Sequence, residues 1–191
     1  MLGNDLVDIE VAYAQKSWRQ ERFRRKVFTP SECAFIGSSD NEFKSIWRMW
    51  SMKESAYKVA IQRGVKRFLN PQKLNCVVID EKRGMVEFDS HIYNTHTMVG
   101  EDYIFTTCSD LDTFVTEDHL VYVNRRSEQS LMTRRALLER IAEKYKYNLN
   151  DLQIKKCQQG IPKLYFKEKP LEVSFSLTHH GKFGAYSIEI N

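Results

Sequence analysis

Residues 42–62 constrain the fold of this chain most, because they carry its strongest helical signal and are apolar nearly all round. At about 100° per residue, the largest apolar side chains of such a helix fall on one stripe. They are Trp47, Trp50, Tyr57 and Ile61, and the apolar surface is widened by Met49, Met52, Ala56, Val59 and Ala60. The narrow polar strip that remains consists of Arg48, Ser51, Ser55 and Lys58. A helix with so little polar surface is central to its fold, and Gly64 is a suitable residue to end it.

The periodicity of the other segments predicts a mixed α+β chain. Before the central helix we expect a strand at 6–9, a helix at 11–26 and a short helix capped by Thr29, with Pro30 first, that ends near Gly37. After it we expect strands at 76–79, 86–88, 103–107 and 120–123, a helix at 131–147, and strands at 163–166, 172–177 and 185–190. This order predicts two α+β halves, residues 1–115 and 116–191, packed as a pseudo-dimer in one compact unit.

Composition favours a well-packed globular protein, since 42% of the 191 residues are hydrophobic and 12% are aromatic. No apolar run approaches the roughly 20 residues that span a bilayer. The first strand follows Met1 so closely that we expect no signal peptide, and hence a cytoplasmic protein without a membrane partner. The four cysteines form no CxxC pair and have no histidine at zinc-ligand spacing, so we expect buried free thiols.

The net charge of +4 is distributed unevenly along the chain. One basic cluster comprises Lys16, Arg19, Arg22, Arg24, Arg25 and Lys26, and a second comprises Arg125, Arg126, Arg134 and Arg135. If residues 11–26 form one helix, Arg19, Arg22 and Lys26 share a face. Such charge suits an anionic ligand, an acidic protein partner or nucleic acid, but it is also typical of a solvated surface.

Glu54 is the most unusual residue of the central helix, because it lies inside the apolar stripe between Trp47 and Ile61. A carboxylate in such surroundings is unfavourable unless it is paired, protonated or bound to a metal. One interpretation is a partly buried salt bridge to Lys53 or to Lys58, and the latter has the ordinary i,i+4 spacing. The other is a metal or catalytic site, which requires a second carboxylate from elsewhere in the chain.

Asp5 can supply that carboxylate from the first strand, where Gly3 permits close approach of another backbone. Two carboxylates, together with phosphate oxygens and water, suit Mg²⁺, a hard cation that prefers oxygen ligands. Asp8 and Glu10 are alternatives, and Asp5 could instead be a turn or cap residue. Asp5 and Asp8 are on opposite faces of a strand, so we do not expect both to bind one ion.

The polar turn at 176–181, with sequence SLTHHG, ends a predicted strand. Its backbone N–H groups, hydroxyls and imidazoles can face an anion, although a plain surface turn is an alternative. Among familiar site motifs, GxGxxG, GxxxxGK[ST], GxSxG and HExxH are all absent from the sequence.

With these residues identified, the chain resembles the 4′-phosphopantetheinyl transferases. The most specific similarity is WSMKESAYK at 50–58, which resembles the family signature Trp-x-x-Lys-Glu-[Ala/Ser]-x-x-Lys. Further elements of the family resemble GNDLVDI at 3–9, FTPSE at 28–32, GIP at 160–162 and SLTH at 176–179. The similar segments therefore extend over nearly the whole chain.

The resemblance implies Mg²⁺-dependent transfer of the phosphopantetheine arm of coenzyme A to a serine of an apo acyl carrier protein or carrier domain, releasing 3′,5′-ADP. It implies that Asp5 and Glu54 hold the metal, and that Glu54 or a metal-associated water takes the serine proton. Lys58 would stabilise charge on the leaving phosphate. The implied coenzyme A contacts are Ser176, Thr178, His179, Lys58, Lys163 and Arg134. The face formed by Arg19, Arg22 and Lys26 would dock the acidic recognition helix of the carrier.

The chain departs from the family pattern in three places. Val7 stands where long members carry a second acid, which is closer to the short holo-acyl-carrier-protein synthase type. The histidine segment comes last rather than first, so we expect two fused halves in the motif order of the short type, acting as a monomer with the site between them. Ile161 replaces a lysine of the family, and a nearby cation such as Lys163 is expected to substitute for it.

Two other functions are compatible with parts of the sequence. One is a coenzyme A-binding scaffold without turnover, which Asp5, Glu54 and Lys58 argue against. The other is a basic RNA-binding module, which the arginine clusters favour and the lack of RNP-type and KH-type motifs disfavours. We therefore expect no nucleic-acid partner.

Overall fold

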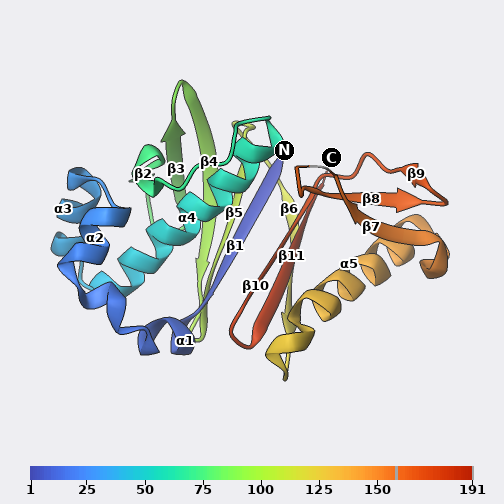
Figure 1. Ribbon diagram of the computed structural model, residues 1–191, viewed down its shortest axis with the longest axis horizontal. Helices are drawn as coiled ribbons and strands as arrows, with labels where there is room; N and C mark the ends of the chain where they lie inside the picture. The colour runs from blue at the N-terminus through green and yellow to red at the C-terminus, as the bar shows by residue number, and fades with distance from the viewer. Residues whose placement is uncertain (158, 191) are drawn as a thin grey trace.

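The computed structural model describes residues 1–157 and 159–190 and confirms a mixed α+β fold. Figure 1 shows two groups of elements side by side, each with one long helix against a sheet. The first group ends with strand β5, Tyr103–Ser109, and the second begins with strand β6, Thr116–Tyr122. None of the described helices is long and apolar enough to cross a membrane.

The first half is built on a five-stranded antiparallel sheet with the order β1-β5-β4-β3-β2. Its further strands are β1, Leu2–Asp8; β2, Asn75–Val78; β3, Arg83–Phe88; and β4, His91–Val99. The sequence did not predict β4, because two of its inward-facing residues are the polar Thr95 and Thr97, buried beside Tyr93. An apolar/polar alternation is therefore weak in this strand.

The central helix α4 spans Glu42–Gln62, as the sequence predicted, and is capped by the Asn41 side chain, which accepts a hydrogen bond from the Lys44 N–H. It lies across the first sheet (Figure 1). The expected polar strip is not an exposed surface, because Ser51 and Ser55 are fully buried. The Ser55 hydroxyl donates to the carbonyl of Ser51 within the helix, and lies 3.1 Å from the Thr106 carbonyl of the sheet. Small residues on this strip therefore let the helix approach the sheet closely.

The predicted continuous helix at 11–26 is wrong. The segment forms α1, Ile9–Ala14, a 3₁₀ turn, Lys16–Arg19, and α2, Glu21–Val27. Gln15 and Gln20 have extended ψ angles of 99° and 128°, which break the helical hydrogen bonding. These breaks let Trp18 turn inward, where it is 9% exposed and packs against Phe43.

The short helix α3, Pro30–Ser38, has the predicted start. Thr29 accepts from the Glu32 N–H and the Glu32 carboxylate accepts from the Thr29 N–H, which completes a capping box. All four cysteines are free thiols, of which Cys76 and Cys108 are buried and Cys33 and Cys157 are half-buried.

The second half repeats the plan of the first. Its long helix is α5, Gln129–Tyr145, and its strands after β6 are β7, Leu152–Lys156; β8, Pro162–Phe166; β9, Lys169–Pro170; β10, Phe175–His180; and β11, Phe183–Glu189. They form two sheets with the orders β10-β11-β6 and β7-β8-β9. In each half the first strand precedes the long helix and pairs with the last strand, as β1 with β5 and β6 with β11.

Strand β1 joins the halves, because its alternate side chains face different partners. On one face, a Cβ added to Gly3 would lie 2.1 Å from the Ser55 carbonyl, so only glycine permits this contact with α4. On the other face, Asn4 donates to the Ser176 carbonyl at 3.2 Å and to the Ser187 hydroxyl at 3.1 Å. Strand β1 is therefore held between α4 and the second half.

Candidate functional site

Asp5, Glu54 and Lys58 come together where β1 meets α4, although Asp5 is far from the other two in sequence. Burial raises the pKa of Asp5 to about 7, opposed by the Lys58 ammonium and supported by the Glu54 carboxylate. Burial also raises the pKa of Glu54, again opposed by Lys58. Burial thus makes ionisation of both carboxyl groups unfavourable, and a neighbouring positive charge would favour it.

Lys58 links the two halves at this site. Its ammonium donates to the Asn4 carbonyl on β1 and to the Leu177 carbonyl on β10, the latter at 3.3 Å. Burial lowers the pKa of Lys58, while Asp5 and Glu54 act to raise it. The orientation of this cation therefore depends on both halves being in place.

The other carboxylates considered from the sequence have different roles. Asp8 lies on the opposite face of β1, where it accepts from the backbone N–H groups of Val11 and Lys182. Glu10 is exposed and pairs with the Lys182 ammonium at 3.4 Å. Neither is placed to join Asp5 and Glu54.

The salt bridge proposed for Glu54 is not found within residues 1–157 and 159–190. Lys53 instead pairs with Glu32 at 2.8 Å in the core, and Lys58 bonds to carbonyl groups. The carboxylate of Glu54 thus lines a cavity, with Lys58 near it as a charge but not in a salt bridge.

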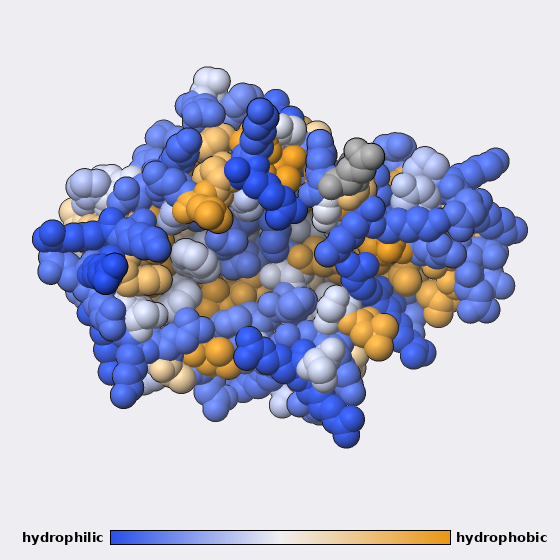
Figure 2. Space-filling view, viewed as in Figure 1, coloured by the Kyte–Doolittle hydropathy of each residue, from blue (hydrophilic) through white to orange (hydrophobic). Residues whose placement is uncertain are grey.

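That cavity has a volume of about 280 Å³ and lies between the two halves. Glu54, Lys58 and Arg67 line it from the first half, and Gly160, Ile161 and Ser176 from the second. Figure 2 shows the surface hollowed between the halves, with polar and apolar side chains mixed in the hollow. Asp5 lies behind this cavity, against α4, rather than in its wall.

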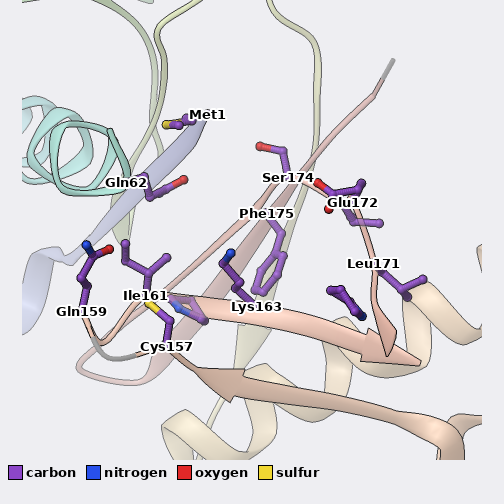
Figure 3. A pocket seen from close by; sticks show the side chains of 13 residues that line it. Met1, Gln62, Cys157, Gln159, Ile161, Lys163, Leu171, Glu172, Ser174 and Phe175 are labelled. Carbon is purple, nitrogen blue, oxygen red and sulfur yellow. The ribbon is translucent and has the colours of Figure 1, made fainter. Parts of the chain in front are cut away.

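A larger hollow of about 700 Å³ adjoins the first and shares Ile161, Pro162 and Phe175 with it. Figure 3 shows Gln62 on one side of this hollow and Lys163 and Glu172 on the other. Neither Glu54 nor Lys58 lines the larger hollow, whereas both line the smaller cavity. We therefore assign the chemistry to the smaller cavity and treat the larger one as its continuation.

The three predicted coenzyme A contacts on β10 differ in their exposure and in whether they line the smaller cavity. Ser176 lines the smaller cavity, but its hydroxyl already accepts from the Asn4 N–H at 3.0 Å. Thr178 is buried at 7% exposure and faces the junction with β1. His179 keeps more than a third of its surface exposed, but partial burial and the nearby cations Lys58 and Arg126 lower its pKa. The structure thus brings His179 near Lys58 and adds Arg126 to the same electrostatic environment.

The two remaining predicted contacts lie further from Glu54. Lys163 is exposed and lines the larger hollow (Figure 3), not the smaller cavity. Arg134 is half-buried on α5 and lines neither.

The three predicted docking cations do not share one helical face. Arg19 is in the 3₁₀ turn, with its guanidinium 5.1 Å from the Tyr13 ring centre and 5.0 Å from that of Trp18, whereas Arg22 and Lys26 lie on α2. All three are exposed, and in the described part of the chain none forms an ion pair. They remain available as a basic surface, although the geometry expected for it is wrong.

The oxygen ligands of Asp5 and Glu54 suit Mg²⁺ chemically, because that ion commonly takes one or two carboxylates and keeps water or phosphate as its other ligands. No group of three or more His, Cys, Asp or Glu side chains that could hold a metal occurs among the described residues. The feature that fits a cation here is a pair of carboxylates, Asp5 and Glu54, whose pKa values are both raised by burial.

Sequence reasoning missed Tyr57, Ile61, Arg67 and Arg126 as residues of this site. Tyr57 and Ile61 appeared only as part of the apolar stripe, and Arg126 only as part of a charge cluster. Arg67 lies in the loop after α4, outside every motif, so no signal in the sequence identified it.

The structure therefore has an α+β fold of two halves, with a cavity lined by residues from both of them beside Asp5, Glu54 and Lys58. A family model for the 4′-phosphopantetheinyl transferase superfamily matches residues 1–108, more than half of the chain. The chain therefore belongs to that superfamily, which makes it a 4′-phosphopantetheinyl transferase and implies coenzyme A and a carrier protein as partners. A search of curated proteins found no match.

Replacing Asp5 by asparagine is expected to stabilise the metal-free protein above pH 7. The pKa of Asp5 is raised from 3.8 to about 7 on folding, so the folded state is penalised as the pH rises through that interval and this carboxyl ionises. In EDTA, the melting temperature of Asp5→Asn should exceed that of the wild type at pH 8, and the two should converge near pH 4. Equal melting temperatures at pH 8 would show that the carboxylate is well solvated.

Proposed function

We propose that the protein is a Mg²⁺-dependent transferase of the holo-acyl-carrier-protein synthase type. It would move the phosphopantetheine arm of coenzyme A to a serine of an apo acyl or peptidyl carrier. The observation that carries this proposal is the meeting of Asp5, Glu54 and Lys58 beside a cavity between the halves.

In the proposed reaction, the serine hydroxyl oxygen bonds to the β-phosphorus of coenzyme A. The bond from that phosphorus to the bridging oxygen breaks, and 3′,5′-ADP leaves. The serine proton passes to Glu54 or to a water beside it. The raised pKa of Glu54 makes its carboxylate a stronger base than an ordinary glutamate.

Lys58 is proposed to stabilise the negative charge that develops on the leaving phosphate, because its ammonium is buried and oriented by two carbonyl groups. His179 is proposed to contact the 3′-phosphate, with the Ser176 and Thr178 segment as its scaffold. When bound, Mg²⁺ held by Asp5 and Glu54 would neutralise charge on the pyrophosphate.

The exposed cations Arg19, Arg22 and Lys26 are proposed to attract an acidic carrier helix. Changing both Arg22 and Lys26 to glutamate is expected to raise the KM for the carrier about tenfold at low salt, because like charges then face each other. The effect should shrink at high salt, and the affinity for coenzyme A should not change. An unchanged carrier KM would place the docking surface elsewhere.

The function is tested by intact mass spectrometry. The protein is incubated with coenzyme A, Mg²⁺ and an apo acyl carrier protein, in parallel with an EDTA arm and a Glu54→Gln arm. The expected result is a gain of one phosphopantetheine arm on the carrier that is absent from both parallel arms. No gain with several different carriers would contradict transfer, and a coenzyme A titration would then separate a non-catalytic coenzyme A-binding protein from an RNA-binding one.

We also propose that the protein acts as a monomer in the cytoplasm. Support for a monomer comes from the cavity, which is lined by residues from both halves of one chain. Light scattering across a range of protein concentrations tests this directly.

A further inference from the structure

The cavity beside Glu54 has few cations available for an anionic ligand. Lys58 and Arg67 are the two cations that line it among the described residues. Lys58 is committed to the Asn4 and Leu177 carbonyls and lies beside two carboxylates. Besides Lys58 and the Mg²⁺ of the proposed function, Arg67 is therefore the described lining residue whose charge could bind a phosphate group.

Arg67 has the geometry of such a donor. It extends from the loop after α4 to the opposite half, where its Nη2 lies 3.0 Å from the Gln159 carbonyl. That contact uses one of the five N–H donors of a guanidinium. Within residues 1–157 and 159–190, Arg67 is paired with no carboxylate. Its remaining donors make no hydrogen bond to the described residues, and Arg67 lines the cavity wall.

The segment that Arg67 contacts is adapted to this close approach. Gly160 has a φ of +79°, and a Cβ added there would lie 2.9 Å from Nη2 of Arg67. The next residue, Ile161, carries no charge, and Lys163 points into the larger hollow. The guanidinium therefore lies over the glycine, beside the position where the chain has an uncharged isoleucine.

We propose that Arg67 binds a phosphate group of the nucleotide substrate and is a specificity-determining residue of this site. The inference rests on the proposed function, since it assumes that coenzyme A enters this cavity. A guanidinium binds phosphate through charge-assisted and often bidentate hydrogen bonds. The Gln159 carbonyl orients Arg67 across the boundary between the halves, so the same residue would connect the halves and bind the ligand.

The test is isothermal titration of coenzyme A into the wild type, Arg67→Ala and Arg67→Lys, without a carrier. Lys66→Ala is the matched control, because it removes the same charge from the neighbouring exposed residue, which does not line the cavity. We expect Arg67→Ala to raise the Kd for coenzyme A about tenfold or more. Arg67→Lys should recover part of this loss, and Lys66→Ala should bind like the wild type.

A second titration with 3′-dephospho-coenzyme A identifies the phosphate. If Arg67 contacts the 3′-phosphate, Arg67→Ala and the wild type should bind this analogue equally. If Arg67 contacts the pyrophosphate, the Kd should rise by the same factor as for coenzyme A.

Two outcomes contradict the proposal in distinguishable ways. Arg67 does not recognise phosphate if the wild type binds coenzyme A and Arg67→Ala has the same Kd. The same conclusion follows if Arg67→Ala and Lys66→Ala raise the Kd by the same factor. If the wild type neither binds coenzyme A nor modifies any carrier, the proposed function is wrong and the role of Arg67 is overturned with it. Thermal unfolding of Arg67→Ala, expected to match the wild type, shows whether a binding loss reflects damage to the fold.

Discussion

Replacing Glu54 by glutamine is expected to lower the rate of phosphopantetheine transfer by about 10³-fold or more. The amide keeps the shape of the side chain but cannot accept the serine proton, and it is a weaker ligand for a hard cation. Burial raises the pKa of Glu54, so the ionised carboxylate is unfavourable in the metal-free fold. The variant should therefore be at least as thermally stable as the wild type in the absence of metal.

The measurement is the rate of mass gain on an apo carrier at saturating coenzyme A and Mg²⁺. Glu42→Gln is the matched control, because Glu42 lies on the same helix but outside the cavity, where it pairs with Arg24 at 2.6 Å. The control should retain nearly full activity. If Glu54→Gln retains it as well, Glu54 is neither base nor metal ligand, and the role of the carboxylate pair must be assigned elsewhere.

Replacing Lys53 by alanine is expected to lower the free energy of unfolding by about 3–5 kcal/mol. Lys53 and Glu32 are each 1% exposed and are joined at 2.8 Å in the core of the first half. Glu32 also accepts from the Thr29 N–H at 2.7 Å and from the Cys76 N–H at 2.6 Å. Removing the ammonium leaves a buried carboxylate without its counter-charge, at the point where α3, α4 and β2 meet.

Denaturant titration at neutral pH measures the effect. Lys44→Ala is the control, since Lys44 is exposed on the same helix and should change stability by less than about 0.5 kcal/mol. A double variant, Lys53→Met with Glu32→Leu, should recover much of the loss, because it replaces both charges with apolar groups. A loss below about 1 kcal/mol for Lys53→Ala would mean that water reaches the pair.

Lys53 is not expected to take part in phosphopantetheine transfer. Lys53 is adjacent to Glu54 in sequence, but its ammonium bonds to Glu32 and to the Pro71 carbonyl at 3.1 Å, away from the cavity. Folded Lys53→Ala protein, at a temperature well below its midpoint, should therefore transfer phosphopantetheine at a rate close to that of the wild type.

Local features of the chain could be predicted because they depend on neighbouring residues. The bounds of α4 follow from its apolar periodicity and from Asn41 at its start, and the start of α3 follows from the pairing of Thr29 with Glu32. The prediction of one helix at 11–26 was wrong because the structure there depends on residues distant in sequence. The helical periodicity of this segment is overridden by the burial of Trp18 against Phe43, which is a long-range contact.

By itself, the sequence determined which groups are available for chemistry and how those on one element are spaced. Glu54 and Lys58 are one turn apart on any helix, and Ser176, Thr178 and His179 are close together in the SLTH segment. The family of the protein could be inferred from these residues, because motif residues keep their order whatever the packing.

Only the tertiary structure decided which groups meet. It directs Asp5 toward α4 and Asp8 toward the second half, pairs Lys53 with Glu32 rather than with Glu54, and carries Arg67 across to Gln159. The physical reason is that each of these contacts joins groups distant in sequence. Their selection depends on burial and on the charge of the whole neighbourhood, which no local pattern encodes.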